Sequence, residues 1–259
     1  MKTKLTTDVF QQYKVEKNNW LKRGRRRLLN TLLQEVIKAK GITEPFELDI
    51  LEVGAGVGQN IPTLQAFGRV EVIEINPIAL AELRAIPGIA QIYETPIPLK
   101  LNKTYDVVCA LDVVEHIEDD RRAVQWLTEH LKPGGYLIVT LPAYQWLFSD
   151  HDIAVGHYRR YTKQTFNGIL PTELVILKSG YFNSVLFIIP AAIRLTKRLL
   201  KYLLPSRHCT LVLRKESSNV PGWLDSIFAN ILLVETKIIE KKPIFPFGLS
   251  VFCMAKKNR

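Results

Sequence analysis

The first half of the chain alternates between short apolar runs and stretches in which apolar residues recur at helical spacing. Residues 48–53 are almost continuously apolar, which is typical of a strand buried on both faces of a parallel sheet. Residues 20–40 instead carry leucines along one helical stripe, and Gly41 follows as a stop signal. The alternation predicts a doubly wound sheet. The predicted strands are 48–53, 70–75, 89–93, 105–111 and 136–141, and the predicted helices are 20–40, 61–67, 78–85 and 121–131, the last stopped by Lys132-Pro133-Gly134-Gly135.

The pattern changes after residue 141. A helix is expected at 165–170, strand material at 173–177 and 181–183, a helical pattern across 225–240 and a last strand at 248–256. The simplest architecture pairs the last two strands antiparallel and inserts about 60 residues between them, far more than an ordinary loop. We therefore expect an α/β fold with a Rossmann-like, doubly wound and mostly parallel sheet, a C-terminal antiparallel strand pair and a helical insert. The expected domains are an N-terminal helical cap at 1–45, a main domain at 46–183 and 247–259, and an insert at 184–246 that serves as lid or docking element.

Charge and cysteine usage restrict the class of protein. The net charge of +10 is clustered at 22–27, 159–163 and 194–201. Such clusters attract phosphates on nucleic acid, lipid or substrate, although a solvated basic face explains each one equally well. The three cysteines are widely separated, so we expect neither a disulfide framework nor a metal site. The first residues have no apolar core, so no signal peptide is visible, and a cytoplasmic location is expected.

A glycine-rich turn marks the candidate cofactor site. The stretch 52–58 reads EVGAGVG between a predicted strand and a predicted helix, and glycines there let backbone N–H groups approach a ligand. Glu74 ends the second strand, where a carboxylate can accept both hydroxyls of a ribose. A dinucleotide site shares these features, but its fingerprint needs glycine where this chain has Gln59, and Glu52 would repel a pyrophosphate. S-adenosylmethionine, which carries an ammonium group and no phosphate, fits these charges better.

The motifs downstream occur in a recognisable order. EVGAGVG at 52–58, VIEIN at 72–76, LDVVEHI at 111–117 and LKPGGYLIV at 131–139 together resemble the class I S-adenosylmethionine-dependent methyltransferases. The resemblance implies that the glycine-rich turn holds the methionine part, Glu74 the ribose, and Glu94, in place of the usual aspartate, the adenine with the Thr95 backbone. Leu111 and Asp112 would line the methyl end. The implied cofactor residues are Glu52, Gly54, Gly56, Glu74, Ile75, Glu94, Thr95, Leu111 and Asp112.

Further blocks at 20–29, 141–162, 181–191 and 246–257 resemble a bacterial subgroup of these enzymes. Its members are often placed beside polysaccharide or glycolipid assembly functions. Methyl transfer needs alignment of the nucleophile and exclusion of water, and an oxygen or nitrogen nucleophile also benefits from a base.

The segment 144–161 follows the fifth strand at the edge where α/β sheets bind ligands, has little helical pattern, and is interpreted as an active-site loop. His157 is the first choice for the base, with His151 and Asp152 as alternates. An equally weighted alternative makes His157 and Arg160 a hydrogen-bonded brace of this loop. His130 looks like a surface residue. The candidate substrate-binding residues are His116, Tyr144, Arg160 and Tyr161.

The stretch 185–204 is apolar and basic, with the composition of an interfacial helix in its second half. A helix packed on the protein's own core is the competing interpretation. The leading hypothesis is methyl transfer to a hydrophobic or lipid-linked acceptor such as a glycan precursor, with an anionic membrane surface as a further partner. A soluble small metabolite is the alternative. RNA is less favoured, because the residues from Asp112 on lack the N/D-P-P-aromatic signature of methylases that act on nucleic-acid amino groups.

Overall fold

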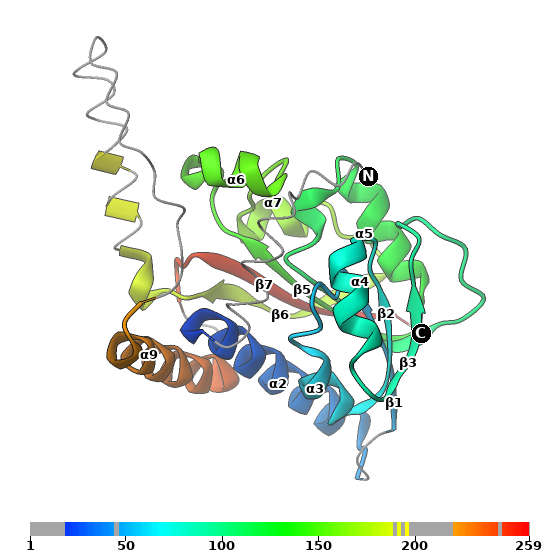
Figure 1. Ribbon diagram of the computed structural model, residues 1–259. Coiled ribbons are helices and arrows are strands. Elements are labelled where there is room, and N and C mark those ends of the chain that lie inside the picture. Colours follow the sequence, from blue (N-terminus) through cyan, green and yellow to red (C-terminus); the bar gives the residue numbers. More distant parts are fainter. Residues whose placement is uncertain are drawn as a thin grey trace.

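The computed structural model describes the chain at residues 19–43, 47–188, 191, 192, 195, 196, 220–242 and 245–258. These residues form one α/β unit whose sheet runs through the middle of the molecule (Figure 1). The described part of the sheet has seven strands in the order β3-β2-β1-β4-β5-β7-β6. The strands are β1 (Leu48–Val53), β2 (Gly68–Ile73), β3 (Ile89–Tyr93), β4 (Tyr105–Leu111), β5 (Leu131–Pro142), β6 (Leu174–Phe182) and β7 (Ser250–Lys257).

Strand β7 is the exception to the parallel arrangement of this sheet. It runs antiparallel to β5 on one side and to β6 on the other, so that Val251 is opposite both Leu141 and Tyr181. The predicted α/β class, the mostly parallel sheet and the C-terminal antiparallel pair are therefore confirmed. The strand order reverses between β1 and β4, which is where open α/β sheets bind ligands at the carboxyl ends of their strands.

The start of β5 was predicted wrongly. Lys132-Pro133-Gly134-Gly135 was interpreted as the stop of a helix before a strand at 136–141, but β5 already begins at Leu131. Leu131 pairs with Tyr105, and the register shifts before Val107 pairs with Tyr136. The Pro-Gly-Gly stretch is thus accommodated as an irregularity inside a strand, where a missing N–H donor is tolerated.

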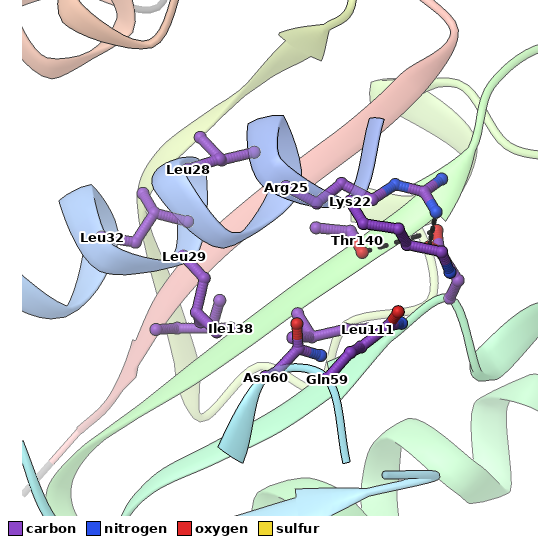
Figure 2. A pocket seen from close by; sticks show the side chains of 11 residues that line it. Lys22, Arg25, Leu28, Leu29, Leu32, Gln59, Asn60, Leu111, Ile138 and Thr140 are labelled. Carbon is purple, nitrogen blue, oxygen red and sulfur yellow. Dashed lines mark hydrogen bonds and ion pairs between the residues drawn. The ribbon is translucent and has the colours of Figure 1, made fainter. Parts of the chain in front are cut away.

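The helices cover both faces of the sheet. Helices α2 and α9 lie together on one face, with α3 beside them, and α5 and α7 contribute to the core on the other face (Figure 1). Leu28, Leu29 and Leu32 project from α2 toward the sheet, where Ile138 lies (Figure 2). The helices are α2 (Trp20–Lys40), α3 (Ile61–Gln65), α4 (Pro77–Arg84), α5 (Asp120–Glu129), α6 (Asp150–Val155), α7 (Lys163–Asn167) and α9 (Gly222–Lys241), with 3-10 turns η1 (Val114–His116), η2 (Gln145–Leu147) and η3 (Val185–Phe187).

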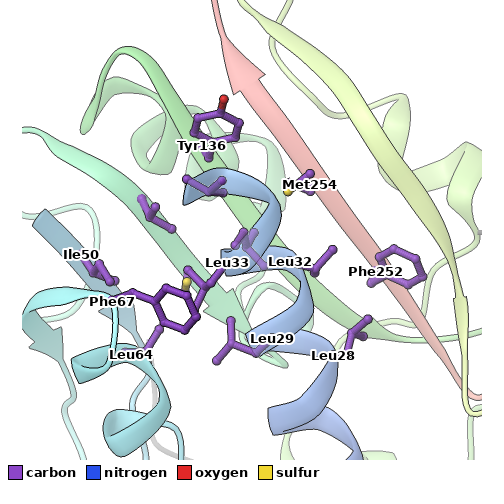
Figure 3. Packing of buried hydrophobic residues seen from close by; sticks show 14 of the residues in the cluster. Leu28, Leu29, Leu32, Leu33, Ile50, Leu64, Phe67, Tyr136, Phe252 and Met254 are labelled. Atoms are coloured by element: carbon purple, nitrogen blue, oxygen red, sulfur yellow. The ribbon is translucent and has the colours of Figure 1, made fainter. Parts of the chain in front are cut away.

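Alternating residues of each central strand feed two hydrophobic cores. In β1, Ile50 faces the core shared with α2, whereas Leu51 faces the core shared with α5, and both are fully buried. Phe252, Met254 and Tyr136 close the first core beneath the leucines of α2 (Figure 3). This two-sided burial is the physical reason why β1 reads as an uninterrupted apolar run.

Helix α9 docks on α2 through a close backbone approach. Gly24 has no side chain at the point where Leu232 packs, and a Cβ there would overlap the leucine. Asp225 accepts a hydrogen bond from the backbone N–H of Trp20 at 2.7 Å and pairs with Arg23. The ring of Trp20 meets Phe228 edge-on at 5.3 Å. The expected helical pattern at 225–240 is therefore confirmed, and its partner is α2.

Most of the remaining insert lies outside the described residues. This applies to the predicted interfacial helix at 194–204, of which only Leu195 and Thr196 are described, to most of the third basic cluster and to one of the three cysteines. The proposed division into cap, main domain and insert stays a prediction. Among the residues that are described, no helix has both the length and the apolar composition needed to cross a membrane.

Candidate active site

The glycine-rich turn after β1 has the conformation that the sequence requires. Gly54, Gly56 and Gly58 all have positive φ angles, of 71°, 55° and 76°. An added Cβ would overlap the side chain of Val113 at Gly54 and that of Ile86 at Gly58, whereas at Gly56 it would meet nothing within 4 Å. The turn therefore leaves open space above Gly56, between the ends of β1 and β2.

Glu74 closes one side of this open space. Its carboxylate accepts hydrogen bonds from the backbone N–H groups of Gly56 at 2.8 Å, of Ile75 at 2.7 Å and of Asn76 at 2.8 Å. The residue is 7% exposed and lies at the end of β2, as predicted. These bonds orient the carboxylate beside the turn, and they leave lone pairs with which it could accept further donors such as ribose hydroxyls.

Glu52 precedes the turn, and only one of its two carboxylate oxygens has a hydrogen-bond partner. One oxygen accepts a hydrogen bond from the Asn60 side-chain amide at 2.8 Å, and the other is buried without a partner. Burial raises the pKa of Glu52 to about 8, and the nearby Glu74 adds to the effect. A buried orphaned carboxylate oxygen is costly. An ammonium group would supply the missing partner, so the residues at this turn fit the aminoacyl end of S-adenosylmethionine.

A cleft lies between α2 and the residues that directly follow this turn (Figure 2). Asp112, at the end of β4, is held there with a positive φ of 57° and pairs with Arg25 of α2 at 2.7 Å. Such a conformation is rare for a residue other than glycine and is often found at functional sites. The residues that line the cleft are Lys22, Arg25, Leu28, Leu29, Leu32, Gln59, Asn60, Leu111, Asp112, Ile138 and Thr140.

The contribution of Lys22 and Arg25 of α2 to this cleft was not predicted. The cluster at 22–27 was interpreted as a basic patch or solvated face, yet Arg25 pairs with Asp112, and Arg23 pairs with Asp225 of α9. Lys22 and Arg25 are three residues apart and so lie on one side of the helix. This spacing was the only sign in the sequence that the two residues act together, because the sequence does not show which side of α2 faces the sheet.

The residues assigned to adenine lie at the surface. Glu94 and Thr95 follow β3 and are exposed, and Glu94 pairs with Arg84 of α4 at 2.5 Å. They are on the same carboxyl edge of the sheet as Glu74, because β3 neighbours β2. Their role toward the cofactor stays a prediction.

The segment after β5 contains a short helix that was not predicted. Helix α6 begins after Ser149, whose N–H and hydroxyl both bond to Asp152 in a capping box, and Gly156 ends it in a left-handed conformation. A single turn and a half is too short for hydrophobic periodicity to reveal. The cap arrangement buries Asp152 completely.

Asp152 organises the catalytic candidates around it. His157 Nδ1 lies 2.8 Å from one carboxylate oxygen, and Arg160 makes two bonds to Asp152, at 2.7 and 3.0 Å. Burial alone would raise the pKa of Asp152, but the bonds from His157 and Arg160 outweigh burial and hold it well below its usual range. Because Asp152 is ionised, Nδ1 of His157 donates in this contact.

Two residues of η1 face His157. Glu115 is fully buried, and its carboxylate lies 3.9 Å from His157 Nε2. The ring of His116 meets that of His157 at 4.6 Å. Burial raises the pKa of Glu115 well above its usual value, with Asp112 adding to the rise, and burial beside His157 lowers the pKa of His116 to about 4. Glu115 was absent from the predicted site, because a single glutamate in the motif gives no sign that it is buried.

The other candidates of this segment differ in their surroundings. His151 is exposed on α6. The hydroxyl of Tyr161 donates to Asp120 at 2.8 Å, and the ring is buried in the core. Burial and this bond to Asp120 raise the pKa of Tyr161 above its usual range. His130 was interpreted as a surface residue and is instead buried beside Trp126, so that prediction is wrong.

Tyr144 lies in an aromatic group at the surface. It has a φ of 60° and stacks on Tyr181 with ring centres 5.2 Å apart. Trp146, Phe187 and Phe247 continue the group, linked by ring contacts of 5.3 to 6.1 Å. Trp146 is 46% and Phe247 41% exposed. Segments that are far apart in the chain thus place an exposed aromatic surface next to the end of β5.

Known proteins that are similar to this chain are methyltransferases, in agreement with the cofactor site described above. A family model described as a methyltransferase domain matches residues 19–216. The curated relatives are ubiquinone biosynthesis O-methyltransferases. That of Rickettsia canadensis is 33% identical over 140 residues, 49% of this chain and 59% of the relative. That of Paramagnetospirillum magneticum is 36% identical over 103 residues, 37% of this chain and 41% of the relative. The chain thus spans about half the length of the curated relatives that it matches.

Solved structures with the same fold are more distant in sequence. The plantazolicin methyltransferase in complex with a pentazolic analogue and S-adenosylhomocysteine aligns with a TM-score of 0.59 at 12% identity, covering 98% of this chain and 92% of that chain. Coclaurine N-methyltransferase aligns with a TM-score of 0.51 at 12% identity, covering 87% of this chain and 71% of that chain. At this level of identity the likeness shows the fold alone.

Proposed function

Because this chain belongs to the methyltransferase-domain family of class I S-adenosylmethionine-dependent enzymes, we propose that it methylates a hydroxyl oxygen of an apolar small molecule. S-adenosylmethionine is the cofactor, and its sulfonium group supplies an already activated methyl group. The observation that carries the proposal is the bond between the fully buried Asp152 and the partly buried His157 at the carboxyl edge of the sheet. The curated relatives, which are named as O-methyltransferases, support the choice of oxygen.

The chain's own residues suit the two ends of the cofactor. Glu52, with its orphaned oxygen, is the proposed partner of the ammonium group, and Glu74 of the ribose hydroxyls. Lys22 and Arg25 line the cleft and suit a carboxylate. Asp112 then lies at the methyl end, where the pairing with Arg25 fixes the position of α2 over the cleft.

His157 is the proposed base. Asp152 fixes the ring so that Nε2 is free to accept a proton, and the residue is largely buried, so little water competes for that nitrogen. The proton of the acceptor hydroxyl passes to Nε2 as the oxygen attacks the methyl carbon. The brace that was weighed as an alternative also exists, since Arg160 bonds to the same carboxylate. The two roles do not conflict, because the brace uses only Nδ1 of His157.

The aromatic surface supports an apolar acceptor. Tyr144, Trp146, Phe187 and Phe247 form a partly exposed aromatic area beside the segment that holds His157. Large exposed apolar patches on soluble domains commonly mark binding sites. A prenyl or lipid chain attached to the acceptor could lie there while its hydroxylated ring reaches the cleft.

Nucleic acid is a poorer fit for the described basic residues. Arg23 and Arg25 are engaged by Asp225 and Asp112, and Arg159 pairs with Asp120 at 2.7 Å. Each of these pairs ties a helix to another part of the chain, so the three arginines do not form a free basic face. A glycan precursor or a soluble metabolite as the methyl acceptor stays a prediction. The same holds for the docking of residues 194–204 on an anionic membrane.

An acceptor comparison tests the proposal. The protein is incubated with methyl-labelled S-adenosylmethionine and either a catechol that carries an isoprenoid chain or the same catechol without it. We expect label in a methyl ether of both compounds, with a lower KM for the prenylated one. Replacing Trp146 by alanine should remove the difference in KM. Equal KM values in the parent protein would reject the apolar acceptor site, and label on nitrogen acceptors alone would reject oxygen as the nucleophile.

A further inference from the structure

Helix α9 has a second apolar side, which its packing on α2 leaves unused. Leu232 points inward against Gly24 of α2, and the helix lies at the margin of the molecule (Figure 1). Its outer side carries four large apolar side chains, which are 66%, 47%, 55% and 36% exposed in the order Trp223, Ile227, Val234 and Ile238. Exposed apolar patches commonly mark sites of interaction.

The four side chains form one stripe along the helix. Consecutive members are four, seven and four positions apart, which keeps them within about 60° of one another around the helix axis. The first and the last member lie about 22 Å apart along that axis. The stripe therefore has the length and the straightness that a second helix needs in order to pack along it.

The stripe is symmetric about its own midpoint. Trp223 and Ile238 lie equally far from that midpoint, and so do Ile227 and Val234, as the numbering shows. A two-fold symmetric interface requires such a pattern, because the same surface of both copies must be complementary to itself. Two antiparallel α9 helices would therefore bring Trp223 onto Ile238 of the second copy. The same arrangement would bring Ile227 onto Val234.

The charges of α9 permit this arrangement. The two lysines of the helix, Lys237 and Lys241, are both exposed. The same symmetry places Lys237 opposite Leu224 of the second copy. It places Lys241 opposite Val220, so the lysines of the two copies do not face each other. Asp225, the acidic residue of the first turn, is turned inward, where it pairs with α2.

We propose that this stripe is the interface of a two-fold symmetric dimer, in which α9 packs antiparallel against α9 of a second copy of this chain. The inner side of α9 is already fixed on α2 by Leu232 and Asp225, so the helix is ordered before the second copy binds. An interface built on one helix from each copy is small. We therefore expect a reversible dimer with a Kd on the order of micromolar.

The pairing is separate from the methyl-transfer site. The stripe is on the side of α9 that faces away from α2, and α2 is the helix that contributes Lys22 and Arg25 to the cofactor cleft. We therefore expect the monomer and the dimer to bind S-adenosylhomocysteine equally well. The proposal goes beyond methyl transfer and does not depend on it.

Analytical ultracentrifugation of the full chain measures the association. We expect a monomer at low and a dimer at high protein concentration. Ile227→Glu places an unpaired charge from each copy in the interface, so it should raise the Kd of the dimer by about 100-fold or more. Val175→Glu is the matched control, because Val175 is 48% exposed but lies on β6, at the edge of the sheet, and this variant should keep the parent Kd. Binding of S-adenosylhomocysteine shows that each variant is folded.

Engineered disulfides test the antiparallel register. Cys209, which lies outside the described residues, is first replaced by serine, and the buried Cys109 and Cys253 are kept. Oxidation of the double variant Ile227→Cys with Val234→Cys should then give a covalent dimer. Within one helix these two positions are about 10.5 Å apart, which is more than a disulfide spans. Each single variant should stay uncrosslinked, because the proposed register also keeps the two copies of one position about 10.5 Å apart.

Labelling of the single variant Ile227→Cys with a thiol reagent distinguishes the possible occupants of the stripe. In a dimer the labelling rate should fall as the protein concentration rises. Protection that is equal at every concentration would show that the chain's own residues cover the stripe, and protection only by added phospholipid vesicles would assign it to a membrane surface. Either result would overturn the pairing. A monomer at about 100 µM, far above the expected Kd, or a Kd that Ile227→Glu leaves unchanged, would do the same.

Discussion

Gly56 and Gly58 allow a paired test of where the cofactor lies. Both have left-handed φ angles, of 55° and 76°, so an alanine at either position costs about 1–2 kcal/mol of backbone strain. At Gly56 the new methyl group meets nothing within 4 Å, whereas at Gly58 it overlaps the side chain of Ile86. Overpacking adds about 1–3 kcal/mol. The free energy of unfolding should therefore fall by about 1–2 kcal/mol in Gly56→Ala and by about 2–5 kcal/mol in Gly58→Ala.

The effect on cofactor affinity should be the reverse: Gly56→Ala should weaken binding more than Gly58→Ala does. The methyl group of Gly56→Ala projects into the open space beside Glu74, where we place the cofactor. Forcing a methyl group against a bound ligand costs about 1–3 kcal/mol, or about 5- to 150-fold in Kd. Urea unfolding measures the first quantity and calorimetric titration with S-adenosylhomocysteine the second. Parent-like affinity in Gly56→Ala, or a more stable Gly58→Ala than Gly56→Ala, would refute this reasoning.

Three further predictions concern single residues elsewhere. Glu74→Ala should raise the Kd for S-adenosylhomocysteine about 100-fold, because two hydrogen bonds to a charged group are lost, and an unchanged Kd would exclude the ribose assignment. Arg25→Ala should raise the KM for S-adenosylmethionine, since Arg25 lines the cleft and pairs with Asp112, and steady-state kinetics measure the effect. Burial would raise the pKa of Asp106, but the bonds from Lys132 and Lys40 lower it. Its contribution to stability is therefore present above the unfolded pKa of about 3.9 and lost as pH falls through the folded value, so the parent should lose more stability than Asp106→Asn between pH 5 and pH 3 in urea titrations. Equal losses would show that this ion pair contributes little.

The sheet could be predicted from the sequence because burial on both faces leaves a strong pattern. Strands β1, β3 and β4 have the predicted bounds. Glu74 could be placed as well, since the end of a strand beside a glycine-rich turn fixes its position in space. The start of β5 was missed because Pro133 and the two glycines after it usually interrupt strands.

The catalytic candidates show the limit of the same reasoning. Asp152 was chosen as an alternate base, yet the capping box of α6 makes it a fully buried acceptor that orients His157. Glu115 was not chosen, although it lies beside that histidine and is as fully buried as Asp152. Both outcomes depend on long-range packing between η1 and the segment after β5, for which periodicity and spacing contain no information.

A single-turnover comparison tests the central claim most directly. The parent protein and His157→Ala are each loaded with methyl-labelled S-adenosylmethionine and mixed with the prenylated catechol, after calorimetry has shown equal binding of S-adenosylhomocysteine. We predict a labelled methyl ether in the parent and a rate lower by about 100-fold or more in the variant, as expected for the loss of a general base. Equal rates in the two proteins, or no ether in the parent, would contradict the account.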